Sequence, residues 1–150
     1  MTNNFNTTRS EVNRSELSNS NTALSPASVA SAGAVTSSSA TAGMGYATGA
    51  GGAVTQASSR TTGVTLNKVA GAITLVSAAG SSTPFSFTVT NSTVAATDTV
   101  VACQKSGTDA YSVAVSAVAA GSFKLTVTDL TGTTTETPVI NFAVIKAVAA

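Results

Sequence analysis

The side chains in this sequence with the widest chemical repertoire are one thiol, six carboxylates and seven basic groups. The thiol belongs to Cys103, and the chain has no histidine and no tryptophan. Without histidine, it cannot build the imidazole relay that usually activates a serine hydroxyl or a cysteine thiol. One thiol without imidazole also falls short of the four nitrogen or sulfur ligands that a zinc site requires. We therefore expect no enzyme activity, no catalytic or metal-binding residue and no cofactor.

Cys103 has no second cysteine with which to form an internal disulfide. The fold therefore does not depend on an oxidising compartment. The residue follows Val100, Val101 and Ala102. In such apolar surroundings the usual role of a free cysteine is that of a small buried hydrophobe, and we predict that role for Cys103.

The carboxylates could serve a glycosidase, which needs two of them facing each other, or a Ca²⁺ site, which needs several converging oxygens. No two of them have a spacing typical of either site, and we interpret them as solvated side chains of turns and strand ends. They are Glu11, Glu16, Asp98, Asp109, Asp129 and Glu136.

A glycine-rich run from Gly43 to Gly52 resembles a phosphate-binding loop only superficially. A P-loop needs a Lys-Ser or Lys-Thr pair after its last glycine, and here Ala53 and Val54 follow. We interpret the run as a close-packed crossover, because glycine lets one backbone approach another. Lys68 has no neighbour in sequence that would depress its pKa, and we interpret it as a solvated lysine at a strand end.

The net charge of +1 comes without any basic cluster. Nucleic-acid binding requires a basic patch that neutralises phosphates, so we expect no nucleic-acid partner. No apolar run approaches the roughly 18 residues of a membrane span. The polar start from Met1 to Phe5 shows no secretory signal. We expect a protein that acts without export, without a membrane and without a small-molecule substrate.

Strand patterns dominate the second half of the chain. Apolar and hydroxyl residues alternate with period two, which is typical of half-buried strands. The strongest patterns begin at Phe85, Tyr111 and Phe123, weaker ones fall at 63–66, 72–76 and 98–104, and a long last strand is expected at 138–148. Strands this short, at such regular spacing, predict an all-β fold: an antiparallel β-sandwich, jelly-roll or Ig-like, or a small barrel.

The first half has a different composition. No charged residue occurs from Leu17 to Ser59, and small neutral side chains predominate there. Such a stretch is either a flexible linker or an arm that is ordered in a groove of a partner, and its lack of charge favours the arm. A capping box, Thr8 to Glu11, predicts a short anchoring helix through Leu17. We thus expect an N-terminal segment at 1–20, an extended arm at 21–62 and a β-sandwich domain at 63–150.

Several stretches resemble the capsid decoration (cement) and head-fibre proteins of tailed bacteriophages. They cover residues 45 to 143 in patches, at 45–56, 63–68, 71–74, 96–100, 119–123 and 139–143. The resemblance implies a virion protein with a β-sandwich head that forms trimers and has no catalytic residues.

We therefore predict a bacteriophage structural protein at the capsid surface, assembled in the host cytoplasm, whose arm binds the major capsid protein. A homotrimer is expected because the core is small and rich in Ala, Val and Thr, and because the last strand is apolar on both faces. The alternatives are a tail fibre or tail adaptor, a virion-displayed carbohydrate-binding β-sandwich, and an exported surface-layer or pilin-like protein. The scarcity of exposed aromatics disfavours carbohydrate binding, and the lack of a signal disfavours export.

Overall fold

The computed structural model describes residue 36, residues 39–41 and residues 43–147. The chain divides into one unit at 1–42 and a second at 43–150. The described part of the second unit, 43–147, is called the β-domain. The predicted anchoring helix, and all but four residues of the predicted arm before Gly43, lie outside the described residues.

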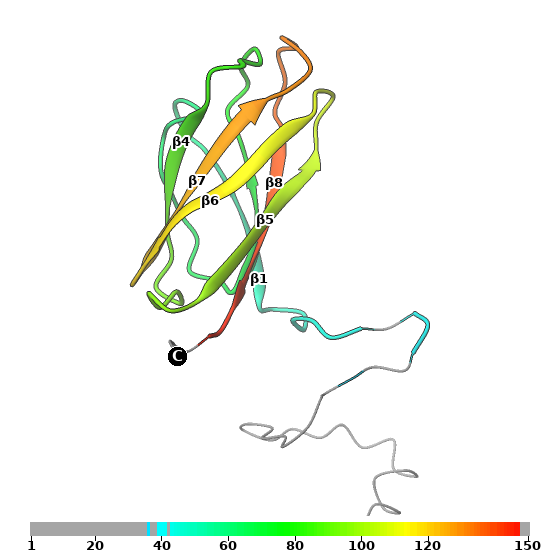
Figure 1. Cartoon of the computed structure of the whole chain (residues 1–150), viewed down its shortest axis with the longest axis vertical. Coiled ribbons are helices and arrows are strands. Elements are labelled where there is room, and N and C mark those ends of the chain that lie inside the picture. Colours follow the sequence, from blue (N-terminus) through cyan, green and yellow to red (C-terminus); the bar gives the residue numbers. More distant parts are fainter. Residues whose placement is uncertain (1–35, 37–38, 42, 148–150) are drawn as a thin grey trace, which may run out of the picture. The chain divides into compact units, whose positions relative to one another are not determined.

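Strands and connecting loops make up the whole β-domain, and the all-β prediction is confirmed (Figure 1). The strands are β1 (Gly51–Thr55), β2 (Val64–Thr65), β3 (Ala70–Thr74), β4 (Phe85–Thr90), β5 (Thr99–Ser106), β6 (Tyr111–Ala119), β7 (Ser122–Asp129) and β8 (Val139–Ile145). Where period-two alternation was strongest, at β4, β6 and β7, the predicted starts agree with the structure to within one residue.

The strands form two four-stranded sheets. Sheet A has the order β1-β3-β8-β5, and sheet B has the order β2-β4-β7-β6. Both sheets are mixed, because β1 pairs with β3 in parallel and β2 pairs with β4 in parallel. The prediction of a purely antiparallel fold is therefore wrong at these two edges. Alternation of side chains specifies which face a residue occupies, but it does not specify the direction of the neighbouring strand.

The predicted boundary at residue 63 is too late, because β1 lies inside the segment predicted as arm. This strand contains Gly51 and Gly52 and has only Val54 as a large apolar residue, so it lacks the side chains by which strands are recognised. The missing volume is supplied from elsewhere. A Cβ on Gly52 would come within 2.9 Å of Leu66, and a Cβ on Gly71 within 2.5 Å of Leu66 and 2.9 Å of Phe142.

The core lies between the two sheets and draws apolar side chains from both. Phe123 of β7 and Phe142 of β8 meet there, with ring centroids 5.1 Å apart and planes tilted by 56°. The buried apolar set is Val64, Ile73, Leu75, Phe87, Val89, Val94, Val100, Tyr111, Phe123, Leu125, Val127, Ile140, Phe142 and Val144.

β8 occupies a central position in sheet A, between β3 and β5. Its Ile140, Phe142 and Val144 are buried in the core, and Val139 and Ala143 on the other face are half-buried among neighbouring strands. The two apolar sides of this strand are thus explained within one copy of the chain. They no longer require a second subunit, which removes one of the arguments for a trimer.

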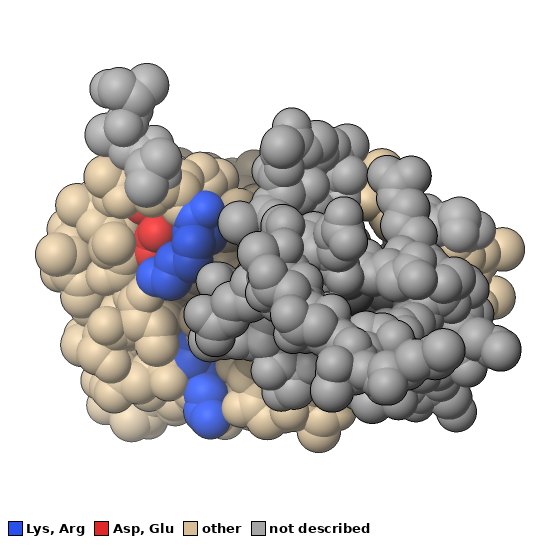
Figure 2. All heavy atoms as spheres, turned by 90° about the horizontal axis from the view of Figure 1, so that it is seen from below, with Lys and Arg blue, Asp and Glu red and all other residues tan. Residues whose placement is uncertain are grey.

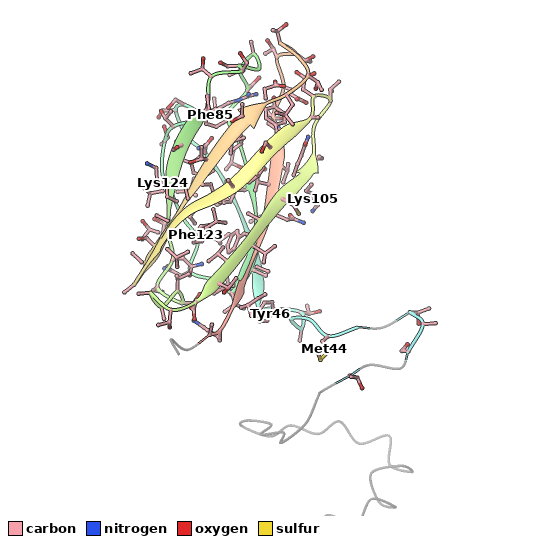
Figure 3. The ribbon with its side chains drawn as sticks, in the orientation of Figure 1. Met44, Tyr46, Phe85, Lys105, Phe123 and Lys124 are labelled. Carbon is pink, nitrogen blue, oxygen red and sulfur yellow. The ribbon has the colours of Figure 1, made fainter. Side chains whose placement is uncertain are left out.

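The two ends of the β-domain differ in what they carry. β1 begins and β8 finishes at the same end, so residues 43–50 and the last described residues, 146–147, lie together there (Figure 1). We call it the arm end. Figure 3 shows Met44 and Tyr46 at this end and Phe85 at the opposite one, which we call the distal end. The loops at 56–63, 75–84, 107–110 and 130–138 form the distal end.

Candidate functional site

The side chains that could take part in catalysis or ligand binding are dispersed over the β-domain rather than gathered in one place. Cys103 is exposed on β5, so the prediction of a buried cysteine is wrong. Its neighbours Val100 and Ala102 point inward, and alternation turns Cys103 outward. Lys68 is exposed, and its ammonium donates to the carbonyl of Gly49 over 3.1 Å. This bond ties the segment before β1 to the loop before β3.

The four described carboxylates lie in or beside loops, as predicted, but three of them are buried rather than solvated. Asp98, Asp109 and Asp129 have relative exposures of 6%, 8% and 3%. Each accepts hydrogen bonds from backbone amides, and so do the oxygens of Glu136, which is half-buried. These side chains thus satisfy loop amides that would otherwise be unpaired. Within 43–147 and the few described residues before it, no group of three possible ligands could hold a metal ion. Glu11 and Glu16 lie outside the described residues.

The pKa values of three carboxyl groups are lowered by these contacts. For Asp98 the main cause is the amide of Ala95, 2.8 Å away, followed by the ammonium of Lys146, whose Nζ lies 2.6 Å from Oδ2. The amide of Thr108 is the main cause of the lowered pKa of Glu136. Burial raises the pKa of Asp129, but hydrogen bonds from the amides of Thr131 and Gly132 outweigh it. All three groups therefore favour the ionised form.

Arg60 is a buried charged residue whose role the sequence did not indicate. It lies just after the uncharged stretch, yet it is only 8% exposed. Its guanidinium donates to the carbonyls of Val76 (3.2 Å), Ala78 (2.6 Å) and Glu136 (3.0 Å), and to the Tyr111 hydroxyl (3.2 Å). An isolated arginine between Ser59 and Thr61 gives no sequence signal for such burial.

This arginine has a structural role, because its guanidinium contacts backbone carbonyls and the core side chain of Tyr111. Its carbon Cζ lies 5.6 Å from the centre of the Tyr111 ring, which belongs to β6 of sheet B. Burial raises the pKa of Tyr111 to about 12, and the nearby Arg60 charge opposes that rise. Arg60 thus links the loop after β1, the loop after β3 and sheet B at the distal end. It does not form an active site with the carboxylates.

The outer face of sheet A is the most unusual surface of the β-domain. Its outward side chains are small or apolar, and only one is charged. We call it the neutral face; it comprises Gly51, Ala53, Thr55, Ala70, Ala72, Thr74, Thr99, Val101, Cys103, Lys105, Val139, Asn141, Ala143 and Ile145.

Large exposed hydrophobic side chains concentrate on the neutral face and near the arm end. Val101 and Ile145 are each 52% exposed, and they occupy adjacent rows, because Val101 pairs with Ala143 and Thr99 pairs with Ile145. The Tyr46 hydroxyl donates to the carbonyl of Val144, which brings the segment before β1 against the end of β8. Figure 2, which views the arm end, shows that the described surface there is mostly uncharged.

An exposed and partly apolar surface with so little charge is typical of an interaction site. Small side chains let a partner approach the backbone closely, and they lose little conformational entropy when they are covered. The described residues contain no helix that is long and apolar enough to cross a membrane. Comparisons of the chain with models of protein families, with curated proteins and with solved structures find no match.

Proposed function

We propose that the chain is a structural protein of a bacteriophage virion that decorates and stabilises the capsid. In this proposal the N-terminal arm binds the major capsid protein, and the two packed sheets form a projecting β-sandwich head. The observation that carries the proposal is the neutral face, a surface with a single charged side chain next to the end at which the arm joins the β-domain. The resemblance of residues 45–143 to decoration and head-fibre proteins supplies the virion context.

The arm suits shell binding because it has no charged side chain from Leu17 to Ser59. A cement protein needs many weak contacts spread over several shell subunits. Backbone amides and carbonyls flanked by Ser, Thr, Ala and Gly supply such contacts, and no buried charge opposes them. The sandwich begins with β1 at Gly51, so the arm that remains for docking ends before that strand.

The neutral face suits contact between copies of the chain. We propose a homotrimer in which Val101 and Ile145 of each copy are covered by a neighbour. Both are 52% exposed in the single copy, where their exposure opposes solubility. A small β-domain is also stabilised when neighbours cover part of its surface.

The first experiment measures where the protein is and how many copies are present. Particles are purified, and the copy number is read from stained gel intensity against the major capsid protein. Hundreds of copies per particle are expected for decoration of the shell. A few dozen or fewer would place the protein on the tail, as a fibre or adaptor, and would overturn the capsid assignment.

The second experiment separates the two proposed surfaces. A variant that lacks residues 1–42 should keep its β circular dichroism and its oligomeric state, but it should lose binding to undecorated particles.

The exposed thiol of Cys103 reports on the neutral face in the full chain. Its reaction with a maleimide should be several-fold slower in the trimer than in dilute monomer. The control is Ser112→Cys on the outer side of sheet B in a Cys103→Ser background, and its thiol should react equally fast in the trimer and in the monomer. Equal rates at Cys103 would contradict the proposed contact.

A further inference from the structure

A hollow of about 470 Å³ opens at the distal end of the β-domain. We call it the distal hollow; it lies between the turn at 58–61, the first part of the loop after β3 at 76–78 and the segment 81–85. Its origin is the short edge strand of sheet B, because β2 pairs only with Val89 and Thr90 at the far end of β4. The opposite half of β4, which begins with Phe85, therefore has no strand beside it at this edge.

The lining combines hydroxyl groups with an apolar floor. The hydroxyl-bearing residues are Ser58, Ser59, Thr61, Ser77, Ser81 and Thr83. Some of these groups are already oriented, since the hydroxyls of Ser59 and Thr61 lie 2.9 Å apart and that of Ser81 accepts from the amide of Thr83 over 3.1 Å. Pro84 and the half-buried ring of Phe85 supply apolar surface. Figure 3 shows Phe85 near the distal tip, far from Met44 and Tyr46.

The one charged residue of the lining is Arg60, and its charge is already used by the fold. Its Nε and Nη2 donate to the three carbonyls of Val76, Ala78 and Glu136, and its Nη1 donates to Tyr111. Its positive charge also acts on the buried carboxylate of Asp129. A buried, hydrogen-bonded guanidinium of this kind shapes the wall, but it offers little attraction to an anion. The distal hollow therefore favours a neutral ligand.

We propose that the distal hollow binds a neutral saccharide, one terminal unit of a glycan. A pyranose ring has an apolar C–H side and a rim of hydroxyls, and this lining presents a matching apolar floor with hydroxyl groups around it. The volume falls within the range of about 300–1,000 Å³ that is usual for ligand sites. The inference does not depend on the virion proposal, because it uses the opposite end of the β-domain and none of the neutral face.

The test is a titration of the ¹⁵N-labelled full chain, followed by ¹H–¹⁵N correlation spectra. The probes are the methyl glycosides of glucose, galactose, mannose and N-acetylglucosamine, with the methyl glycoside of glucuronic acid, whose carboxylate is free, as the anionic comparison. We expect at least one neutral glycoside to give saturable shifts at amides of 58–61, 76–78 and 81–85. A single sugar in an open hollow should have a Kd on the order of 1 mM.

Matched variants locate the binding. Ser77→Phe fills the exposed rim of the hollow and should abolish the saturable shifts, whereas Ser112→Phe, an equally exposed change on the outer side of β6, should leave the Kd unchanged. Phe85→Leu keeps an apolar floor but removes the ring, and it should weaken binding by about tenfold. If Phe85→Leu does not fold, the Ser77 and Ser112 pair still decides.

Three results would overturn the proposal. The first is the absence of saturable shifts with every neutral glycoside. The second is binding of the glucuronate alone, which would mean that Arg60 attracts anions after all. The third is saturable shifts that persist in Ser77→Phe, because they would place the sugar elsewhere on the protein.

Discussion

The two outer faces of the β-domain have the same strand geometry but different side chains. On the neutral face of sheet A, the outward positions hold mainly Gly, Ala and Val together with Cys103 and Ile145. On sheet B most outward positions carry hydroxyls, and we call this the hydroxyl face; it comprises Thr65, Ser86, Thr88, Thr90, Ser112, Ala114, Ser116, Ala117, Ala119, Ser122, Lys124, Thr126 and Thr128. Each face has one lysine, Lys105 or Lys124, and Figure 3 shows these on opposite sides of the ribbon.

The difference supports the proposal that a second copy covers the neutral face while the hydroxyl face meets water. On the hydroxyl face, the Thr126 hydroxyl lies 2.9 Å from those of Ser86 and Ser116, so three strands are joined by a polar row that also accepts water. The neutral face has few such groups, and its Val101 and Ile145 are half-exposed. Net charge does not distinguish the two faces. Their capacity to bond water does, and it favours the neutral face as the contact between copies.

The largest expected effect comes from removing the link between the sheets that carry these faces. Arg60→Met removes a buried donor to the carbonyls of Val76, Ala78 and Glu136, of which only Ala78 and Glu136 keep a backbone bond, each to the other's amide. We expect the free energy of unfolding to fall by about 3 kcal/mol or more. Urea denaturation measures it, and Lys105→Met, an exposed change on the neutral face, should stay within about 0.5 kcal/mol of the wild type. Similar losses in the two variants would contradict the linking role of Arg60.

The next effect concerns the neutral face alone. Val101→Lys or Ile145→Lys places a charge where a second copy should pack, and each change should weaken trimer formation by about 2 kcal/mol, roughly thirtyfold. Sedimentation velocity over a range of concentrations measures the association. Leu130→Lys is the matched control, because Leu130 is 63% exposed but lies in a distal loop. If Leu130→Lys dissociated the trimer and the other two variants did not, the contact would be at the distal end.

The sequence specified the hydroxyl face better than the neutral face, for a physical reason. β4, β6 and β7 of sheet B alternate large apolar residues with Ser and Thr, and this contrast made them recognisable. In sheet A, the inward positions of β1 and β3 begin with Gly52 and Gly71, and only Val54 and Ile73 are large, so alternation leaves little contrast in side-chain size. β1 was accordingly assigned to the arm. Its inward volume comes from Leu66, which is close in space but not in the strand itself.

The neutral face and the distal hollow were likewise hard to predict from the sequence. The uncharged stretch from Leu17 to Ser59 was visible in the sequence, but the neutral face combines residues from four strands that are far apart along the chain. Arg60 was not recognised because its partners are mostly backbone carbonyls, which leave no trace in the residue types. The distal hollow depends on where β2 begins, and a two-residue strand has no detectable period.

A pH series separates the stability of the β-domain from the chemistry of its faces. Neither face carries a carboxylate, so trimer formation should stay constant from about pH 5 to about pH 8. Stability should fall in acid. Asp98, Asp129 and Glu136 have lowered pKa values in the folded state, so their contribution is complete above the ordinary values of 3.8 and 4.5 and is lost as the pH falls through the lowered ones.

On the alkaline side of the same series, stability should fall as the pH rises. The pKa of Tyr111 is raised from 10.0 to about 12, so its contribution is complete below pH 10 and is lost as the pH rises toward 12. Urea midpoints at each pH measure both limbs, and Glu136→Gln should show a shallower acid limb than the wild type. A trimer that dissociated near neutral pH would instead mean that titrating groups lie in the contact.

The smallest effect is expected from exchanging single groups between the faces. Thr126→Val removes a hydroxyl that bonds Ser86 and Ser116, but both partners can turn to water, and valine favours strands as much as threonine does. Unfolding free energy should fall by about 0.5 kcal/mol, and association should not change.

Ala143→Thr is the reciprocal change, in the row of Val101 on the neutral face. It should leave stability almost unchanged but weaken association by about 1 kcal/mol, because the added hydroxyl must lose water when a second copy covers it. Calorimetric dilution measures the association of each variant. If Thr126→Val created a new association, polarity alone would be what keeps the hydroxyl face free. If Ala143→Thr left association unaltered, the centre of sheet A would lie outside the contact.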